Sequence, residues 1–269
     1  MKTVNVGGVR LATVDEGRGV PLVLVHGFPL DHSMWQNQID HFSRHCRVIA
    51  PDLRGFGSSD ATPGTVNMAE MADDVAGLLD AIEVKQPVVL AGLSMGGYVA
   101  FQFWRRHAQR LRGLVLCDTR AMADTAEAAA QRHQTAERVL REGPAFLAET
   151  MLSKLLAPVT LNSRPEVAEK IRRSIESAHA EGVAAASRGM AERPDVTPWL
   201  GEIEIPTLVI VGQYDAISPV EEMRRIAAAI PGAKLVEVSN AGHMSPLENP
   251  AAVNRAIGEF LEIRQPPTG

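Results

Sequence analysis

Short, almost continuously apolar runs recur along this 269-residue chain, and helical patterns separate them. Strands that are buried on both faces have this composition, and parallel sheets are built from such strands. The alternation of strands and helices therefore predicts an α/β fold with a mostly parallel, doubly wound sheet. The runs expected to form strands are residues 21–27, 47–52, 87–94, 111–118, 207–215 and 234–243.

Residues 3–15 alternate apolar and polar side chains around Gly7-Gly8, which favours a β-hairpin. Helices are expected where a capping residue precedes apolar side chains at helical spacing. These helices cover residues 67–83, residues 218–230 and a segment that begins at Asn249-Pro250, with Asn67, Ser218 and Asn249 as the caps.

The alternation stops between about residues 120 and 200, where the chain is rich in Ala, Glu and Arg. Helical spacing such as that of Val167, Ile171 and Ile175 predicts three or four helices there. An excursion from the end of a strand lies over the edge of an open α/β sheet at which ligands bind. We predict a core of residues 1–119 and 201–269, with residues 120–200 as a helical cap.

Composition excludes several classes of protein. The net charge is −5 and no basic block occurs, so a nucleic-acid partner is not expected. Apolar runs are too short to span a membrane and the first residues lack a signal-peptide core, so we expect a cytoplasmic protein. Cys46 and Cys117 lie within apolar runs, which favours buried, inert thiols. No zinc motif or phosphate-binding glycine loop is present, and we expect neither a metal nor a cofactor.

The motif Gly92-Leu93-Ser94-Met95-Gly96 follows one apolar run and precedes a helical pattern. G-x-S-x-G in this setting is typical of a nucleophile elbow, a turn so sharp that it thrusts the serine above the sheet. Side chains at the two flanking positions would clash in such a turn, and glycine avoids this. Ser94 is therefore the predicted nucleophile.

A serine hydroxyl needs a base to take its proton. Among the eight histidines, His243 follows the last strand-like run directly and precedes the last helix. It is the predicted base. Except for His26, the remaining histidines lie in polar stretches and are expected to be solvated: His32, His41, His45, His107, His133 and His179.

The base needs an acid that holds its tautomer. Asp215 ends the run 207–215, and the order Ser94, Asp215, His243 is the order of a triad in this strand–turn–helix setting. Asp118 ends the run 111–118 and could supply the carboxylate instead, or could orient the cap. We favour Asp215.

An oxyanion hole needs two backbone N–H groups. The candidates are Met95, which follows the nucleophile, and Phe28, in the loop after the strand 21–26; Pro29 has no N–H. His26 is expected to be structural and to hydrogen-bond this loop. Trp35 could equally wall the pocket or belong to the core.

Taken together, the motifs resemble those of the α/β-hydrolase superfamily over nearly the whole chain. They are His26-Gly27-Phe28-Pro29, Asp52-x-Arg54-Gly55-x-Gly57-x-Ser59, Gly92-x-Ser94-x-Gly96-Gly97, Gly212-x-x-Asp215 and Gly242-His243. Within this superfamily the chain resembles the small capped branch that includes carboxylesterases, 3-oxoadipate enol-lactonases and perhydrolases, and Cys117-Asp118-Thr119-Arg120-Ala121 resembles the lactonases. This resemblance implies an α/β-hydrolase fold with a helical cap, and an architectural role for the Asp52–Arg54 loop.

We therefore expect a serine hydrolase that cleaves small esters or lactones through an acyl-enzyme on Ser94. A perhydrolase or acyl transferase would use the same triad, and so would a carbon–carbon bond hydrolase, although those often have Asn where this chain has Leu93. A non-enzymatic ligand sensor is a further alternative. No sequence feature specifies the oligomeric state.

Substrate choice is expected to depend on the cap. Its apolar residues suggest a roof over a modest pocket: Met122, Met151, Leu152, Leu155 and Leu156. An arginine that faced the pocket would favour a substrate with a carboxylate. The candidate arginines are Arg120, Arg132, Arg138 and Arg188, each of which could instead be solvated.

Overall fold

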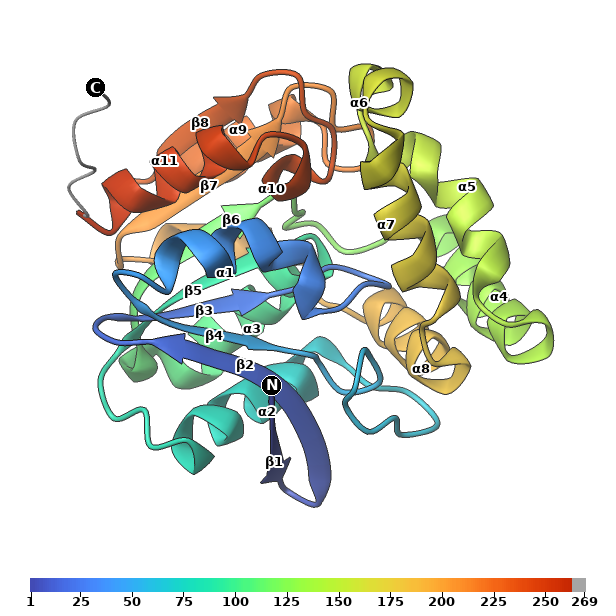
Figure 1. Ribbon diagram of the computed structural model, residues 1–269, viewed down its shortest axis with the longest axis horizontal. Helices are drawn as coiled ribbons and strands as arrows, with labels where there is room; N and C mark the ends of the chain where they lie inside the picture. Colours follow the sequence, from blue (N-terminus) through green and yellow to red (C-terminus); the bar gives the residue numbers. More distant parts are fainter. Residues whose placement is uncertain (263–269) are drawn as a thin grey trace.

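A computed structural model describes residues 1–262 of the chain (Figure 1). Within these residues, eight strands form one sheet in the order β1-β2-β4-β3-β5-β6-β7-β8. The antiparallel pairs are β1 with β2 and β2 with β4, and every other neighbouring pair is parallel. The strands are β1 (Lys2–Val6), β2 (Val9–Gly17), β3 (Pro21–Val25), β4 (Arg47–Pro51), β5 (Val88–Leu93), β6 (Leu111–Cys117), β7 (Thr207–Gly212) and β8 (Lys234–Val238).

The predicted hairpin is present as β1 and β2, and each of the six apolar runs forms a strand. The central strands β3, β5 and β7 are buried at every position, which explains why their sequences do not alternate. The predicted α/β class and mostly parallel sheet are therefore confirmed.

Helices cover both faces of the sheet. Figure 1 shows α1 and α11 in front of the strands, with α3 behind them. The helices outside the segment between β6 and β7 are α1 (Gln36–Phe42), α2 (Met68–Ala81), α3 (Met95–His107), α9 (Val220–Ala229), α10 (Ser245–Glu248) and α11 (Pro250–Phe260), with 3-10 turns η1 (His32–Trp35) and η2 (Ala108–Arg110). Asn67 caps α2 and Asn249 caps α11, as expected.

The capping role expected for Ser218 is wrong. Pro219 is the residue that precedes α9, and the buried Ser218 hydroxyl has no partner among residues 1–262. The reason is local. The backbone N–H of Ser218 donates to Asp215 Oδ1 over 2.9 Å, which draws this residue toward the preceding turn instead of the helix.

A helical insertion lies between β6 and β7. Residues 118–206, all within the described part of the chain, contain five α-helices, one more than the expected upper number. Figure 1 shows them grouped on the side of the sheet to which the arrow of β3 points. They are α4 (Ala126–Glu142), α5 (Ala145–Leu155), α6 (Pro158–Ser163), α7 (Pro165–Glu176) and α8 (Ala180–Ala191), followed by the turn η3 (Thr197–Glu202). The division into a core and a cap stays a prediction, and residues 263–269 of the expected core lie outside the described residues.

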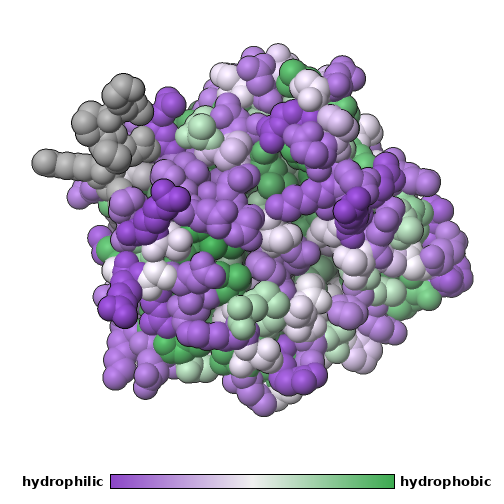
Figure 2. Space-filling view, in the orientation of Figure 1, coloured by the Kyte–Doolittle hydropathy of each residue, from purple (hydrophilic) through white to green (hydrophobic). Residues whose placement is uncertain are grey.

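Both cysteines are buried and free, in agreement with inert thiols. None of the helices within residues 1–262 is long and apolar enough to cross a membrane. On the face that Figure 2 shows, apolar residues form small scattered groups among a predominantly polar surface.

Candidate active site

Ser94 lies in a strained turn between β5 and α3. Its φ of 55° and ψ of −114° place a non-glycine residue in the left-handed half of backbone space. The flanking glycines make this turn possible: a Cβ at Gly92 would lie 2.1 Å from the carbonyl oxygen of Gly96, and a Cβ at Gly96 would lie 2.3 Å from that of Val25. The predicted elbow is thus present, with the serine only partly buried at the start of α3.

Two further bonds fix the backbone of Ser94. Its N–H donates to the carbonyl oxygen of Cys117 at the end of β6, over 3.0 Å. Its own carbonyl oxygen accepts a 2.8 Å bond from the Thr119 hydroxyl. The turn is therefore tied to the neighbouring strand, which maintains the strained conformation.

His243 and Asp215 form a buried pair. His243 Nδ1 lies 2.9 Å from Asp215 Oδ2 and 3.0 Å from Oδ1, and the two residues are 1% and 6% exposed. Asp215 Oδ1 also accepts the N–H groups of Ile217 and Ser218, over 2.8 and 2.9 Å. A carboxylate in the ionised form only accepts, and with Asp215 in that form the pair would carry its proton on Nδ1 and leave Nε2 of His243 free to accept one.

The three predicted residues follow strands β5, β7 and β8. These strands run parallel, so their carboxyl ends lie on the same side of the sheet. Within residues 1–262 the Ser94 hydroxyl makes no hydrogen bond to His243. Bonds between nucleophile and base are often long before substrate binds. The contact between Ser94 and His243 is therefore part of the proposal below.

Asp118 lies beside this pair but serves other partners. Its Oδ1 accepts the N–H of Gly212 over 2.7 Å, and its Oδ2 accepts the Ser245 hydroxyl. Burial raises the pKa of Asp118 well above its ordinary value, and the negative charge of Asp215 raises it further. The structure thus brings Asp215, and not Asp118, into contact with His243.

The loop expected to supply the second oxyanion donor lies against the serine. A Cβ built at Gly27 would be 3.4 Å from the Cβ of Ser94, which places Gly27, the residue before Phe28, next to the nucleophile. His26 is fully buried; its Nδ1 lies 3.0 Å from the Gly27 carbonyl oxygen and its Nε2 accepts the N–H of Leu53 over 2.9 Å. The loop-holding role expected for His26 is therefore present.

Met95 is the first residue of α3, so its N–H has no carbonyl acceptor within the helix. The partial positive charge of a helix N-terminus favours an anion there. Trp35, which could have walled the pocket, is fully buried in the core cluster.

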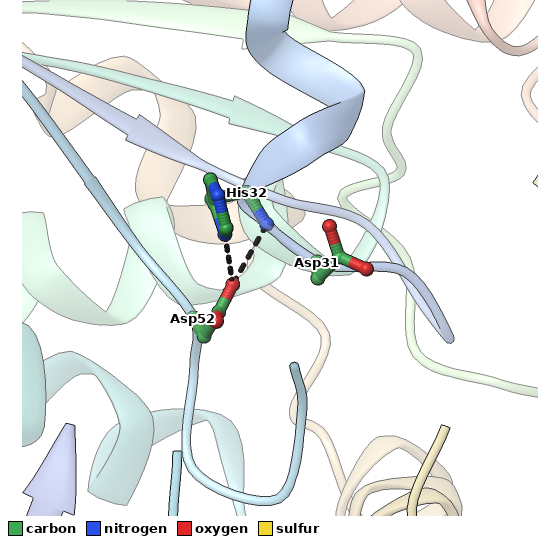
Figure 3. A group of neighbouring side chains, drawn as sticks. All are labelled: Asp31, His32 and Asp52. Carbon is green, nitrogen blue, oxygen red and sulfur yellow. Dashed lines mark hydrogen bonds and ion pairs between the residues drawn. The ribbon is translucent and has the colours of Figure 1, made fainter. Parts of the chain in front are cut away.

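A second cluster combines two acids and a histidine, and Figure 3 shows its geometry. Both the backbone N–H and Nδ1 of His32 bond to Asp52 Oδ1, over 2.9 and 2.6 Å, while Asp52 Oδ2 accepts the N–H of Ser58. Asp31 is engaged by the Ser33 N–H and by the Ser174 hydroxyl from α7. Through these hydrogen bonds the cluster connects η1 to the loop after β4 and to α7.

The expectation that His32 and His107 are solvated is wrong. The hydrogen bond to Asp52 raises the pKa of His32 above its ordinary value, although burial opposes this. Burial disfavours the ionised form of Asp52, but its bonds from His32 and Ser58 outweigh this and lower its pKa. His107 is partly buried, with its Nε2 2.7 Å from Asp73. Neither polar partner adjoins its histidine in sequence, so the local pattern gave no sign of either pair.

A groove of about 910 Å³ opens between α4, α5 and the core. Phe28, from the predicted oxyanion loop, and Ile217, two residues after Asp215, form part of its wall. Met151 lines it as expected, whereas Met122 is exposed at the surface. The three leucines that were expected in the roof are buried in the core instead: Leu152, Leu155 and Leu156.

The lining of this groove contains more cationic than acidic side chains. The acids are Asp124 and Glu137, and of the four candidate arginines only Arg188 is absent from the wall; it bonds to the Gly64 carbonyl oxygen. Some of the cations are paired: Arg120 with Glu222, and Arg132 with Asp124. The cationic side chains in the wall are Arg120, Arg132, Arg138, Arg141 and Lys154.

Comparison with known proteins identifies the family of the chain. Residues 20–250 match the family model described as the alpha/beta hydrolase fold, and the chain belongs to this family, in its small esterase and lactonase branch.

The chain is 31% identical to 3-oxoadipate enol-lactonase 2 of Acinetobacter baylyi, over 93% of this chain and 92% of that one. A malate-bound thermophilic esterase from Thermogutta terrifontis is similar at 51% identity and a TM-score of 0.95, over 97% of both chains. The enol-lactonase from Burkholderia xenovorans LB400 is similar at 30% identity and a TM-score of 0.90, over 97% of this chain and 100% of that one. Relatives below 30% identity include hydrolases of carbon–carbon and carbon–halogen bonds. The family therefore establishes a hydrolase, and the bond it cleaves is a separate question.

Proposed function

We propose that this protein hydrolyses carboxylic esters or lactones of small molecules through an acyl-enzyme on Ser94. The observation that carries the proposal is a serine on a strained elbow at the same sheet edge as a buried histidine–aspartate pair. A serine nucleophile supports acyl transfer, since dehalogenases of this fold carry an aspartate at the elbow. The similarity to an esterase and to enol-lactonases supports the same bond type.

In the proposed mechanism, His243 Nε2 removes the proton of Ser94 as its oxygen attacks the substrate carbonyl carbon. Asp215 keeps the proton on Nδ1 and stabilises the imidazolium that forms. The N–H groups of Met95 and Phe28 stabilise the tetrahedral oxyanion. His243 then protonates the leaving alcohol, and water activated by the same nitrogen releases the acid.

The excess of cations in the groove supports a substrate that carries a carboxylate, because arginine binds carboxylates in a bidentate manner. Arg138 is a suitable candidate, since its guanidinium carbon stacks 3.8 Å from the Phe146 ring centre and its partner Glu142 is outside the wall. A monoester of a dicarboxylic acid should therefore have a lower KM than its neutral analogue of the same length.

The first experiment measures hydrolysis of p-nitrophenyl esters and small lactones by the wild type and by Ser94→Ala. Turnover by the wild type and none by Ser94→Ala is the expected result. Equal activity in both proteins would contradict the proposal. If neither protein cleaves any ester or lactone, cleavage of a carbon–carbon bond by the wild type would favour a carbon–carbon bond hydrolase, and consumption of peroxide would favour a perhydrolase. Tight ligand binding without turnover would favour a sensor.

A further inference from the structure

Glu248 is a buried carboxylate next to the site, and the mechanism above does not use it. It is the last residue of α10 and is 6% exposed. No ion pair involves it within residues 1–262, although a buried acid without a cation is unfavourable unless hydrogen bonds stabilise its charge. Four donors supply these bonds, and they come from two parts of the chain.

One oxygen of Glu248 holds the loop of His243. Oε1 accepts the N–H of Gly242 over 2.8 Å and the N–H of Met244 over 3.3 Å. These amides lie immediately before and after His243. The backbone of the predicted base is therefore fixed on both sides by a single atom.

The other oxygen holds the helical insertion. Oε2 accepts the N–H of Ala157 over 2.8 Å and the hydroxyl of Thr160 over 2.6 Å, and both residues lie at the turn from α5 to α6. The side chain thus spans from the insertion to the histidine loop, and it binds each side with a different oxygen.

Backbone contacts show how closely these two segments approach. The N–H of Met244 also donates to the carbonyl oxygen of Leu155 over 3.1 Å. A Cβ at Gly242 would lie 2.6 Å from the nitrogen of Ala157, so only glycine allows the approach. In addition, Arg164 donates to the backbone carbonyl oxygen of Glu248 over 2.8 Å.

We propose that Glu248 is a positioning residue that couples the insertion to His243, so that the position of the α5–α6 turn determines the alignment of His243 with Ser94. The inference rests on the proposed function, because it assigns Glu248 an effect on the base of that mechanism. A displacement of about 1 Å in a catalytic group reduces a rate by about 100-fold, so a partial release should be measurable.

Glu248→Gln is the direct perturbation. The amide oxygen can still accept from one side, but its NH₂ group cannot accept the N–H of Ala157 or of Gly242. One of the two segments must therefore lose its anchor while the shape of the side chain is kept. Thr160→Val is milder: it removes only the hydroxyl bond on the side of the insertion.

The matched control is Asp74→Asn. Asp74 is another buried carboxylate, at 5% exposed, but it lies on α2 and pairs with Arg54 over 2.6 Å, away from His243. If the loss of any buried carboxylate slows the reaction by destabilising the fold, Asp74→Asn should be slow as well. If the alignment of His243 is the cause, only Glu248→Gln should be slow.

The readouts are kcat, KM and the rate at which a fluorophosphonate probe labels Ser94, a reaction in which the serine oxygen displaces fluoride with help from the base. Folding is checked by circular dichroism. We expect folded Glu248→Gln to show kcat and labelling rates about 10- to 100-fold lower with KM within about twofold, Thr160→Val a severalfold loss of the same kind, and Asp74→Asn wild-type rates.

Wild-type labelling by folded Glu248→Gln would overturn the inference, as would an equal loss in Asp74→Asn. If Glu248→Gln does not fold, Thr160→Val decides, and a wild-type labelling rate there overturns it. Failure of the probe to label wild-type Ser94 would instead refute the proposed function, which keeps the two failures distinct.

Discussion

Gly92→Ala tests the elbow with a single methyl group. The Cβ of alanine would lie 2.1 Å from the carbonyl oxygen and 2.4 Å from the carbonyl carbon of Gly96, both of them backbone atoms that no side-chain rotation can move aside. Ordinary Cβ contacts begin at 3.4 Å, so the end of β5 and the start of α3 must separate by about 1 Å. Ser94 and Met95 lie between Gly92 and Gly96 and must move with them.

A shift of this size predicts a fall in kcat of about 100-fold, equivalent to about 2.7 kcal/mol of transition-state stabilisation. The accompanying overpacking should lower the free energy of unfolding by about 1–3 kcal/mol. Both quantities are measurable, from the hydrolysis of p-nitrophenyl acetate and from urea denaturation.

Gly201→Ala is the matched control, because the nearest atom to its Cβ is the carbonyl oxygen of Ala229, at 4.0 Å. It should keep wild-type kcat and stability within about 0.5 kcal/mol. A folded Gly92→Ala protein with wild-type kcat would refute the claim that glycine is needed for the elbow.

Three further predictions concern the acids beside His243, the His32–Asp52 pair and the hydrophobic core. Asp215→Asn should lower kcat by about 10⁴-fold, because the amide favours the wrong tautomer of the base, whereas Asp118→Asn keeps an acceptor for Gly212 and should lose far less; equal losses in steady-state kinetics would contradict the assignment. The raised pKa of His32 means that its ion pair stabilises the fold fully below the ordinary value of 6.5 and less as pH rises through the folded-state value. The difference in unfolding free energy between wild type and His32→Asn should therefore shrink above that pH, and a constant difference in denaturant titrations would refute this. Phe42→Ala removes a fully buried ring and should cost about 3–5 kcal/mol, measured by thermal melting; a loss below 1 kcal/mol would show that the core collapses around the gap.

The local sequence predicts the inner strands of the sheet well, because burial on both faces makes their sequences almost continuously apolar. Val23 and Leu24 in β3, like Val209 and Ile210 in β7, are fully buried, and their neighbours are apolar as well. The elbow is similarly local, since Gly92 and Gly96 flank Ser94 within one turn. Most features whose cause lies within a few residues could therefore be predicted from the sequence.

Contacts between residues that are far apart in the sequence could not be predicted in this way. Glu248 bonds to Ala157 and Thr160, about 90 residues away, and the sequence shows only a single acid a few residues after His243. The position of that acid, so close to the predicted base, is the signal that could have identified it. Ser218 failed as a cap for a different, local reason: its backbone N–H is bound by Asp215, three residues earlier, and helix-capping patterns do not consider this competition.

The insertion also bears on how the chain closes its sheet. Pairing Leu114 with Thr207 joins β6 to β7 across about 90 residues of intervening chain. The entropic penalty for closing a loop grows only logarithmically, so doubling its length adds about 0.6 kcal/mol. Shortening or lengthening the insertion should thus affect the sheet little, provided that the α5–α6 turn still reaches the histidine loop. The part of the insertion that lines the groove should consequently be exchangeable almost independently of the elbow that bears the nucleophile.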